Sequence, residues 1–364
     1  MLMTEEITTD FLLESTLFYG DEASPLLAPR GVWMQGERLF VSDTGQNRVF
    51  IWNCLPDGKH QPPDVTLGQP ENTDTKRNSG QAVSARTLHY PSGLWSDGEV
   101  LIVADAWNHR VLIWHTFPVT NGQPADVVLG QPDFQHNEPN VGGVGSTPGA
   151  DSLNWPYGVF SDGSSLWIAD TGNRRVLYFK EIPTESYQPA DGVIGKQRFD
   201  ERDYENTDPI WPYSVKISPN GEMAITDTQY YRVLLWKDWK TAFDQKADVI
   251  IGQETFEANG QNQYRLQPAS FTLNWCYDSF FHQGSLFIAD TGNSRILKFH
   301  PVPRHHNPAA HSLIGHDDFG TGSENAKTMM GTSNALYWPF SICMNNKIIA
   351  IADTGNHRIV LKPI

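Results

Sequence analysis

Ala169-Asp170-Thr171-Gly172-Asn173-Arg174-Arg175-Val176 is one of six related octapeptides in this chain. All six place aspartate second and arginine seventh, and the other five start at Ser42, Ala104, Thr226, Ala289 and Ala352. Successive copies follow at intervals of about 60 residues, the length of a small supersecondary unit. A recurrence this regular indicates a repeat protein, in which each unit packs mainly on its neighbours.

Each octapeptide connects two apolar runs, such as residues 166–169 and 176–179. These runs are rich in aliphatic, β-branched and aromatic residues, a composition typical of buried strands. Thr-Gly-Asn between strands is a tight-turn signal, because glycine and asparagine readily take positive φ angles. The octapeptide therefore predicts a β-hairpin that is repeated six times.

Two further motifs add a strand on each side of the hairpin. Leu153-Asn154-Trp155-Pro156-Tyr157-Gly158 is one of the motifs that precede every hairpin, and proline is tolerated as the first residue of a strand. Asp126-Val127-Val128-Leu129-Gly130-Gln131 is one of those that follow each of the first five hairpins. Each unit then has four strands, as in a β-propeller blade.

The repeats predict six blades joined by long loops, at about residues 27–69, 88–131, 153–196, 210–253, 273–316 and 336–364. The sixth blade lacks its fourth strand. Ser15-Thr16-Leu17-Phe18-Tyr19-Gly20, within an N-terminal segment at residues 1–20, matches that strand and would cover an exposed sheet edge. We therefore expect an all-β, six-bladed β-propeller that forms one domain over residues 1–364 and is closed by residues 15–20.

Charge and cysteine content narrow the classes of function. The 364 residues carry a formal net charge of −15, and a surface of that sign repels a phosphate backbone, so nucleic-acid binding is disfavoured. Cys54, Cys276 and Cys343 are too few, and odd in number, for a disulfide framework. No apolar run reaches the length of a signal peptide or membrane span, so we expect a cytoplasmic protein with no membrane association.

The hairpins resemble the NHL repeat, named for Asn-His-Leu. The likeness rests on Asn108-His109-Arg110-Val111 and residues 353–359, and the element at 130–134 is similar to the bacterial branch of that family. Six copies over essentially the whole chain make the likeness specific for fold. It implies a six-bladed ring, whereas the functions of such rings include protein interaction, RNA binding, extracellular sensing and lyase chemistry. The family's peptide-amidating lyases place metal-binding histidines around the channel, but here His109 and His357 lie in hairpin turns, so that set has no match.

Six Asp–Arg pairs flank the hairpin turns. They could form a ring of carboxylates that binds a cation or substrate, or an architectural network in which aspartate accepts turn N–H bonds and arginine bridges within or between blades. The presence of the pair in all six blades favours architecture, because a ligand site is normally asymmetric. The pairs are Asp43/Arg48, Asp105/Arg110, Asp170/Arg175, Asp227/Arg232, Asp290/Arg295 and Asp353/Arg358.

The motifs that start the first strands carry the candidate binding residues. In a four-stranded blade they share one face with the hairpin turns and the long loops, next to the channel, where a polar and aromatic mouth suits a ligand or peptide. The tryptophans would also suit the wedges between blades, and each tyrosine, two residues on, should point to the same side of a regular strand. The candidates are Arg30, His89, Tyr90, Asn154, Trp155, Tyr157, Trp211, Tyr213, Asn274, Trp275, Tyr277, Asp278, Trp338 and Phe340.

Blade five departs from the common pattern, because Cys276 stands in place of proline and Asp278 in place of glycine. An acid beside a thiol disfavours the thiolate, so we predict that Cys276 is buried and is not a nucleophile. Asp278 breaks the symmetry and is a stronger functional candidate than any repeated residue. A solvated or turn-bonding carboxylate is the competing interpretation.

The sequence favours a non-enzymatic binding or scaffold protein that holds a protein or peptide on the face with the long loops. No catalytic residue is assigned, because neither a Ser–His–Asp set nor a nucleophile elbow is recognisable. A lyase or hydrolase with a metal-assisted site at the channel mouth is the alternative, and RNA binding is a minor third one. No cofactor is predicted, and Ca²⁺ or Zn²⁺ in the channel stays open.

Overall fold

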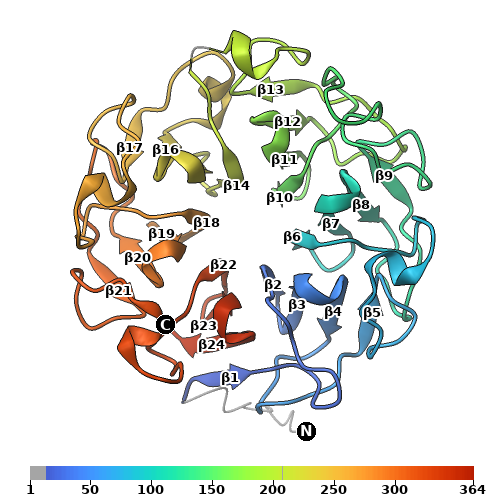
Figure 1. Ribbon diagram of the computed structural model, residues 1–364, viewed down its shortest axis with the longest axis horizontal. Coiled ribbons are helices and arrows are strands. Elements are labelled where there is room, and N and C mark those ends of the chain that lie inside the picture. The colour runs from blue at the N-terminus through green and yellow to red at the C-terminus, as the bar shows by residue number, and fades with distance from the viewer. Residues whose placement is uncertain (1–13, 207) are drawn as a thin grey trace, which may run out of the picture.

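The computed structural model describes residues 14–206 and 208–364. Six four-stranded antiparallel sheets stand as blades around a central axis (Figure 1), so the predicted all-β, six-bladed propeller is confirmed. Every helical element in the described residues is a short 3-10 turn. Within that part of the chain, no helix is long and apolar enough to cross a bilayer.

In the first five blades the inner strand comes first in the sequence and the outer strand last. Blade one contains β2 (Gly31–Gln35), β3 (Arg38–Asp43), β4 (Arg48–Trp52) and β5 (Val65–Leu67). Blade two contains β6 (Pro91–Ser96), β7 (Leu101–Asp105), β8 (Arg110–Trp114) and β9 (Val127–Leu129). Blade three contains β10 (Pro156–Ser161), β11 (Leu166–Asp170), β12 (Arg175–Phe179) and β13 (Gly192–Ile194).

The second half of the ring repeats this order. Blade four contains β14 (Pro212–Ile217), β15 (Met223–Asp227), β16 (Arg232–Trp236) and β17 (Val249–Ile251). Blade five contains β18 (Cys276–His282), β19 (Ser285–Asp290), β20 (Arg295–Phe299) and β21 (Ser312–Ile314). Blade six contains β22 (Pro339–Met344), β23 (Ile348–Asp353) and β24 (Arg358–Pro363).

Blade six takes its outer strand from the start of the chain, as the sequence predicted. β1 (Thr16–Phe18) pairs antiparallel with β24, with Leu17 opposite Val360, and the sheet order is β1-β24-β23-β22. Phe18 is fully buried there and meets Trp52 of blade one edge to face at 5.0 Å between ring centroids. The two ends of the chain therefore share one blade (Figure 1).

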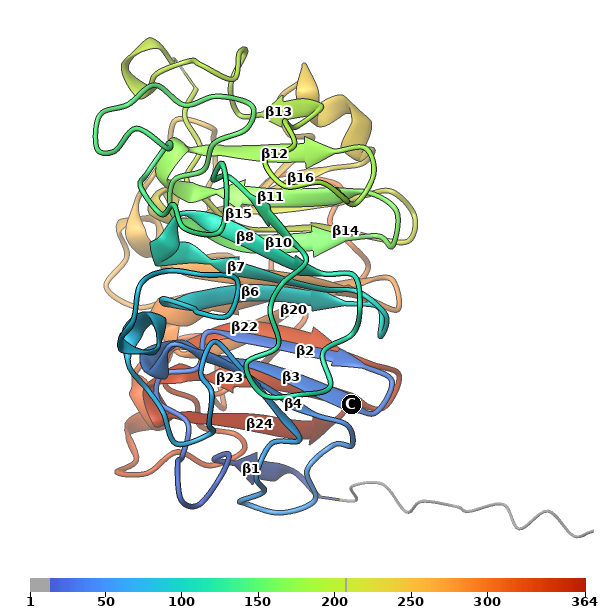
Figure 2. The same cartoon turned by 90° about the vertical axis from the view of Figure 1, so that its right-hand side faces the viewer.

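The core lies in the wedges between blades. Each apolar cluster joins neighbouring sheets: Phe40 and Val49 of blade one, for example, pack with Leu101 and Val103 of blade two. The hairpin turns and the loops that lead into each inner strand lie together on one side of the ring, which we call the turn face (Figure 2).

Each hairpin turn is one turn of 3-10 helix, and in the four turns that contain glycine, this residue does not have the positive φ that the sequence predicted. In η4 (Thr171–Asn173) the left-handed residue is Arg174, just after the turn, at φ 54°. Gly172 is needed for a different reason, because a Cβ there would lie 2.5 Å from the main-chain oxygen of Asn154. The glycine therefore serves the close approach of the chain that starts the inner strand.

The turn of one blade is bonded to the next blade around the ring. Thr171 Oγ1 donates to the Pro212 carbonyl at 2.6 Å, and four other blades repeat this bond. Blade two has Ala106 at this position, which has no hydroxyl to donate. The other four pairs are Thr44 to Pro91, Thr228 to Cys276, Thr291 to Pro339 and Thr354 to Pro29.

The left-handed residue after the turn makes a second link between blades. His109 Nδ1 accepts the Trp155 N–H at 3.1 Å, and His357 Nδ1 accepts the Ala28 N–H at 3.1 Å. The Asn-His positions of the repeat thus join blades. In blades one and five the bonds run from the Tyr90 N–H to Asn47 and from the Trp338 N–H to Ser294.

The six Asp–Arg pairs form a buried network that holds the loops to the hairpins. Arginine Nε lies 2.7–2.8 Å from aspartate Oδ2 in every blade. The second oxygen of Asp170 accepts the N–H of Asn154, just before the inner strand, rather than a turn N–H as the sequence suggested. Arg175 Nη1 donates to the carbonyl of Phe199, and its Nη2 donates to those of Gly149 and Ser152.

Candidate functional site

The residue before each inner strand decides which aromatic side chains reach the channel. Trp155, Trp275 and Trp338 have φ of 49–51°, and the pairing register shifts within the first residues of β10, β18 and β22. This irregularity breaks the alternation of a regular strand, so the prediction that tryptophan and tyrosine point to the same side was wrong. Tyr157 and Tyr277 line the channel cavity, whereas the tryptophans two residues before them do not.

Six side chains from six blades close the channel mouth, and we call them the aromatic collar. Successive ring centroids lie 4.7 Å apart for Tyr157 and Tyr213, 4.6 Å for Tyr213 and Tyr277, and 4.2 Å for Tyr277 and Phe340. The Arg30 guanidinium lies 4.1 Å from the Phe340 centroid and 5.1 Å from that of Tyr90. Tyr90 meets Tyr157 edge to face at 6.4 Å, which completes the circle.

Burial keeps the collar hydroxyls protonated. It raises the pKa of Tyr277 to about 12, and it raises the pKa values of Tyr90, Tyr157 and Tyr213 as well, against the opposing effect of the Arg30 charge. Neutral phenols can both donate and accept hydrogen bonds. Tyr157 already accepts one from Trp107 Nε1 at 3.2 Å.

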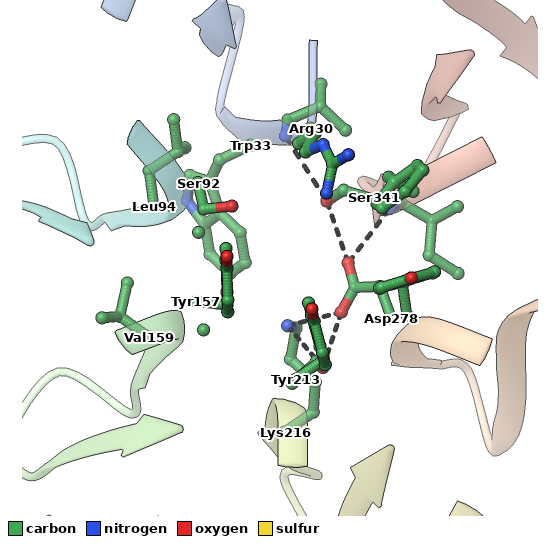
Figure 3. Close-up of a pocket in the computed structure, with 17 residues that line it drawn as sticks. Arg30, Trp33, Ser92, Leu94, Tyr157, Val159, Tyr213, Lys216, Asp278 and Ser341 are labelled. Carbon is green, nitrogen blue, oxygen red and sulfur yellow. Dashed lines mark hydrogen bonds and ion pairs between the residues drawn. The ribbon is translucent and has the colours of Figure 1, made fainter. Parts of the chain in front are cut away.

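A buried ion pair lies directly below the collar (Figure 3). Asp278 Oδ1 accepts from Lys216 Nζ at 2.8 Å and from Ser214 Oγ at 2.7 Å, and Oδ2 accepts from Ser341 Oγ at 2.9 Å. The main-chain N–H groups of Ser279 and Ile342 add two more bonds. Asp278 is only 5% exposed. It is therefore neither the solvated nor the turn-bonding acid that the sequence left open, but joins β14, β18 and β22 across the channel.

The space around this pair is small. The cavity below the collar measures about 40 Å³, room for one or two water molecules. Trp33 of blade one fills the channel further down, because its ring contacts both Trp95 of blade two and Phe280 of blade five. A ligand larger than a few atoms would have to bind on top of the collar or displace it.

The channel mouth offers a cation few free ligands. Both Asp278 oxygens are hydrogen-bonded, and a metal ion beside them would face the Lys216 ammonium. Among residues 14–206 and 208–364 there is no group of three or more histidine, cysteine or acidic side chains arranged to hold a metal. Ca²⁺ or Zn²⁺ in the channel stays a prediction that elemental analysis of the protein can test.

Three of the candidate residues have contacts that explain them as parts of the scaffold. The main-chain N–H groups of His89, Asn154 and Asn274 each donate to the hairpin aspartate of their blade. Burial lowers the pKa of His89, whose ring packs edge to face on Trp107. Cys276 is fully buried, as predicted, and burial raises the pKa of its thiol well above the usual range.

The tryptophans of the inner-strand starts lie on the turn face rather than in the wedges. Trp155 is 47% exposed and Trp338 45% exposed, and Leu27 and Trp107 are exposed to a similar degree. These four residues, which we call the apolar half-ring, come from the consecutive blades six, one, two and three. Trp211 is instead covered by the Arg174 guanidinium at 4.2 Å, and Trp275 packs against Tyr231.

Lys216 is the functional-site residue that the sequence reasoning missed. It lies where the other inner strands carry Trp33, Trp95, Phe160, Phe280 and Cys343, two residues beyond the position of Asp278 in the repeat. A single lysine in a column of apolar residues breaks the symmetry just as Asp278 does. Aligning the inner strands over their full length would have found the pair.

Comparisons with known proteins support the fold and no more. No family model matches the chain, and no curated protein is similar to it in sequence. Among solved structures, the Kuenenia stuttgartiensis hydrazine synthase is similar with a TM-score of 0.52 and 11% sequence identity over 93% of this chain and 96% of that one. A structure of streptogramin B lyase gives a TM-score of 0.48 and 10% identity over 96% of each chain. The first similarity shows a shared propeller architecture.

Proposed function

We propose that this chain is an NHL-type binding module that holds a protein or peptide partner on its turn face. The observation that carries the proposal is the apolar half-ring of Leu27, Trp107, Trp155 and Trp338, four side chains that are exposed on the turn face. The half-ring borders the channel mouth, which the aromatic collar closes. Tryptophan, tyrosine and arginine are the residues that most often dominate the energy of protein interfaces. A partner that covers the half-ring would bury these side chains around Arg30.

The filled channel favours surface binding over a reaction in the pore. A cavity of about 40 Å³ cannot take up a small-molecule substrate, since ligand pockets usually measure about 300–1,000 Å³. Asp278 is the acidic residue that the sequence singled out because it differs from its equivalents in the other blades. Its charge is compensated by Lys216 and by four further hydrogen bonds. Its position supports a role in holding three blades in register beneath the binding face.

The cysteines support a cytoplasmic location for the proposed module. Cys54, Cys276 and Cys343 are all free thiols, and the first of them is exposed. Exposed free thiols are usual where the cell keeps cysteines reduced. We expect the partner to be met in the cytoplasm.

The test removes two of the four half-ring side chains without touching the collar. Wild-type protein and a Trp155→Ala/Trp338→Ala double variant are used to capture partners from cells of the native source, with quantitative mass spectrometry as the measurement. Val119→Ala is the matched control, because Val119 is an apolar side chain that is 71% exposed on the opposite face, between β8 and β9. We expect partners that the control retains and the double variant loses.

Two results would contradict the proposal. One is an identical set of captured proteins for all three forms, which would exclude the half-ring as the binding surface. The other is a stoichiometric metal in the purified protein that disappears in Asp278→Asn, which would favour the metal-assisted enzyme instead.

A further inference from the structure

The hairpin turn of blade two departs from the other turns at one exposed residue. Trp107 stands where four other turns have glycine, and blade four has Gln229 there. The Trp107 main-chain N–H donates to the His89 carbonyl at 3.1 Å, as the glycine N–H groups do in their own blades, so this bond of the scaffold does not require the tryptophan side chain. The four glycines are Gly45, Gly172, Gly292 and Gly355.

The Trp107 side chain is held in place although it is 43% exposed. Its ring stacks on Tyr90 with 4.4 Å between the ring centroids, and its Nε1 donates to the Tyr157 hydroxyl at 3.2 Å. The His89 ring packs edge to face against it at 5.2 Å. An aromatic ring that its neighbours already hold loses little conformational freedom when a partner binds.

The loop that leads into blade two contains a second departure. Asn78 and Asn108 exchange two side-chain hydrogen bonds, of 3.2 and 2.8 Å, which fasten this loop to the hairpin turn. Arg77 precedes the loop asparagine, and it has no carboxylate within ion-pair distance among residues 14–206 and 208–364. Equivalent asparagine pairs fasten three other loops, and the residues before their loop asparagines are Pro139, Gln261 and Glu324.

A cavity of about 470 Å³ lies between this loop and Trp107. Its volume is within the usual range of ligand sites, roughly 300–1,000 Å³. The structure describes all the residues that line it, and none of them is acidic, although the chain carries a formal net charge of −15. Hydrogen-bond donors line the cavity on the side chains of Arg77, Gln81, His89 and Asn137.

The charges around the cavity favour an anion. Burial lowers the pKa of His89, and the Arg77 charge acts in the same direction, against the opposing effect of Asp105. Asp105 is itself paired with Arg110 at 2.8 Å, so its charge is already compensated. A guanidinium group binds a carboxylate through two parallel hydrogen bonds, which makes this pairing both strong and specific in geometry.

We propose that this cavity binds an acidic side chain of a partner peptide, whose carboxylate pairs with Arg77 while an apolar neighbour in the peptide lies against Trp107. The inference rests on the proposed function and adds the chemical class of the partner, an acidic peptide segment. Charge complementarity identifies the occupant, because the lining provides donors and no carboxylate. Trp107 belongs to both the cavity and the apolar half-ring, so one peptide can contact the two.

The experiment selects ligands and tests their charge. Random dodecapeptides displayed on phage are selected on the wild-type protein and on Arg77→Glu, which reverses the charge at the cavity. Lys237→Glu is the matched control, because Lys237 is a 53% exposed cation that follows β16 on the opposite face. The Kd of each selected peptide is then measured by fluorescence anisotropy, and thermal unfolding checks that every variant is folded.

We expect wild type and Lys237→Glu to select peptides with aspartate or glutamate beside an apolar residue, and Arg77→Glu to select lysine or arginine at that place. Exchange of the acid for its amide should weaken binding to wild type by about 10- to 100-fold, and binding to Arg77→Gln by much less. Ala82→Phe should also weaken binding, because Ala82 is an exposed residue of the lining and the larger side chain would fill the cavity.

Three results would overturn the inference: no saturable peptide ligand, the same peptides selected by wild type and Arg77→Glu, or displacement of the peptides by an equal concentration of single-stranded RNA. Peptides that Trp155→Ala/Trp338→Ala weakens and Arg77→Glu leaves unchanged would overturn it as well, but would leave the proposed function standing. Acidic peptides that depend on Arg77 and not on the two tryptophans would support the cavity and contradict the half-ring.

Discussion

His109 shows how much one repeated residue does. Its Nδ1 accepts the Trp155 N–H across the seam between blades two and three. Because Nδ1 accepts this bond, it carries no proton, and the imidazole is neutral. The residue is 8% exposed, and burial lowers its pKa to about 4, against the opposing effect of the Asn154 side chain, which favours the protonated ring. The residue after the hairpin turn of blade two thus links two blades by a bond that acid should break.

The first prediction is a loss of stability at mildly acid pH. The pKa of His109 is about 4 in the folded protein and near 6.5 in the unfolded chain, so the unfolded state binds more protons below pH 6.5. Its contribution is fully present above pH 6.5 and is lost as the pH falls toward 4. At pH 5 we expect a loss on the order of 1–2 kcal/mol, measured by denaturant unfolding at pH 7.5 and pH 5.

The control for this prediction comes from blade one, where Asn47 makes the same bond without titrating. His109→Asn should therefore unfold with a smaller difference between the two pH values. Equal pH dependence in both proteins would show that other groups control the acid response.

The second prediction concerns the ion pair below the collar. Lys216→Met leaves the Asp278 charge buried without its partner, and we expect the free energy of unfolding to fall by about 3–5 kcal/mol. Lys237→Met, which removes a half-exposed lysine 3.8 Å from Asp248, should cost less than about 1 kcal/mol. Lys216→Met/Asp278→Asn should recover part of the loss, and a double variant no more stable than Lys216→Met would argue against the pair as the cause.

At the level of single residues, the sequence drew attention to positions where the symmetry is broken inside a recognised motif. Asp278 was found in this way, and Lys216 was missed because it lies two residues beyond the motif. The surroundings of Asp278 could not be predicted, since Ser214, Lys216 and Ser341 come from strands far apart in the sequence. The collar was only partly foreseen, because a left-handed residue just before the inner strand in blades three, five and six turns tryptophan and the following aromatic side chain to different sides.

Elements of the ring are joined by the hairpin turns. The threonine of five turns bonds to the next blade, whereas Ala106 leaves the seam between blades two and three without this bond. The strands themselves were predictable from apolar runs and their spacing. The role of glycine in the turn could not be predicted, because glycine is needed there for the close approach of another segment and not for a local φ angle.

The third prediction is a stabilising substitution. Ala106→Thr should add a hydrogen bond to the Pro156 carbonyl, by analogy with Thr171 and Pro212, and raise the free energy of unfolding by about 0.5–1.5 kcal/mol. Ala106→Val has the same shape without the hydroxyl and should give no such gain. Equal effects of the two variants on the thermal midpoint would show that packing rather than the bond is responsible.

The whole molecule depends on the closure of blade six. The closing strand was predictable because the sixth repeat lacks its outer strand and a matching segment stands at the other end of the chain. Phe18 is the fully buried residue of β1, and Leu17 on the same strand is only half-buried.

The fourth prediction uses this contrast. Phe18→Ala removes an aromatic ring from the seam between blades six and one and should lower the free energy of unfolding by about 3–5 kcal/mol. Leu17→Ala should have a clearly smaller effect in the same denaturant titration. Similar losses for the two variants would mean that pairing of β1, rather than burial of Phe18, supplies the stability of the closure.

The same closure sets an order of events during synthesis. β1 leaves the ribosome before every strand of the five other blades, and its partner β24 leaves after all of them. Blade six is therefore the last to assemble, and the growing chain carries β1 as an unpaired strand until translation has passed β24. Contacts between such distant segments form slowly, and the unpaired strand edges are open to aggregation until these contacts have formed. The ring is thus most vulnerable as a nascent chain, and a chaperone that shelters β1 during that interval would speed its maturation without altering the stability of the finished propeller.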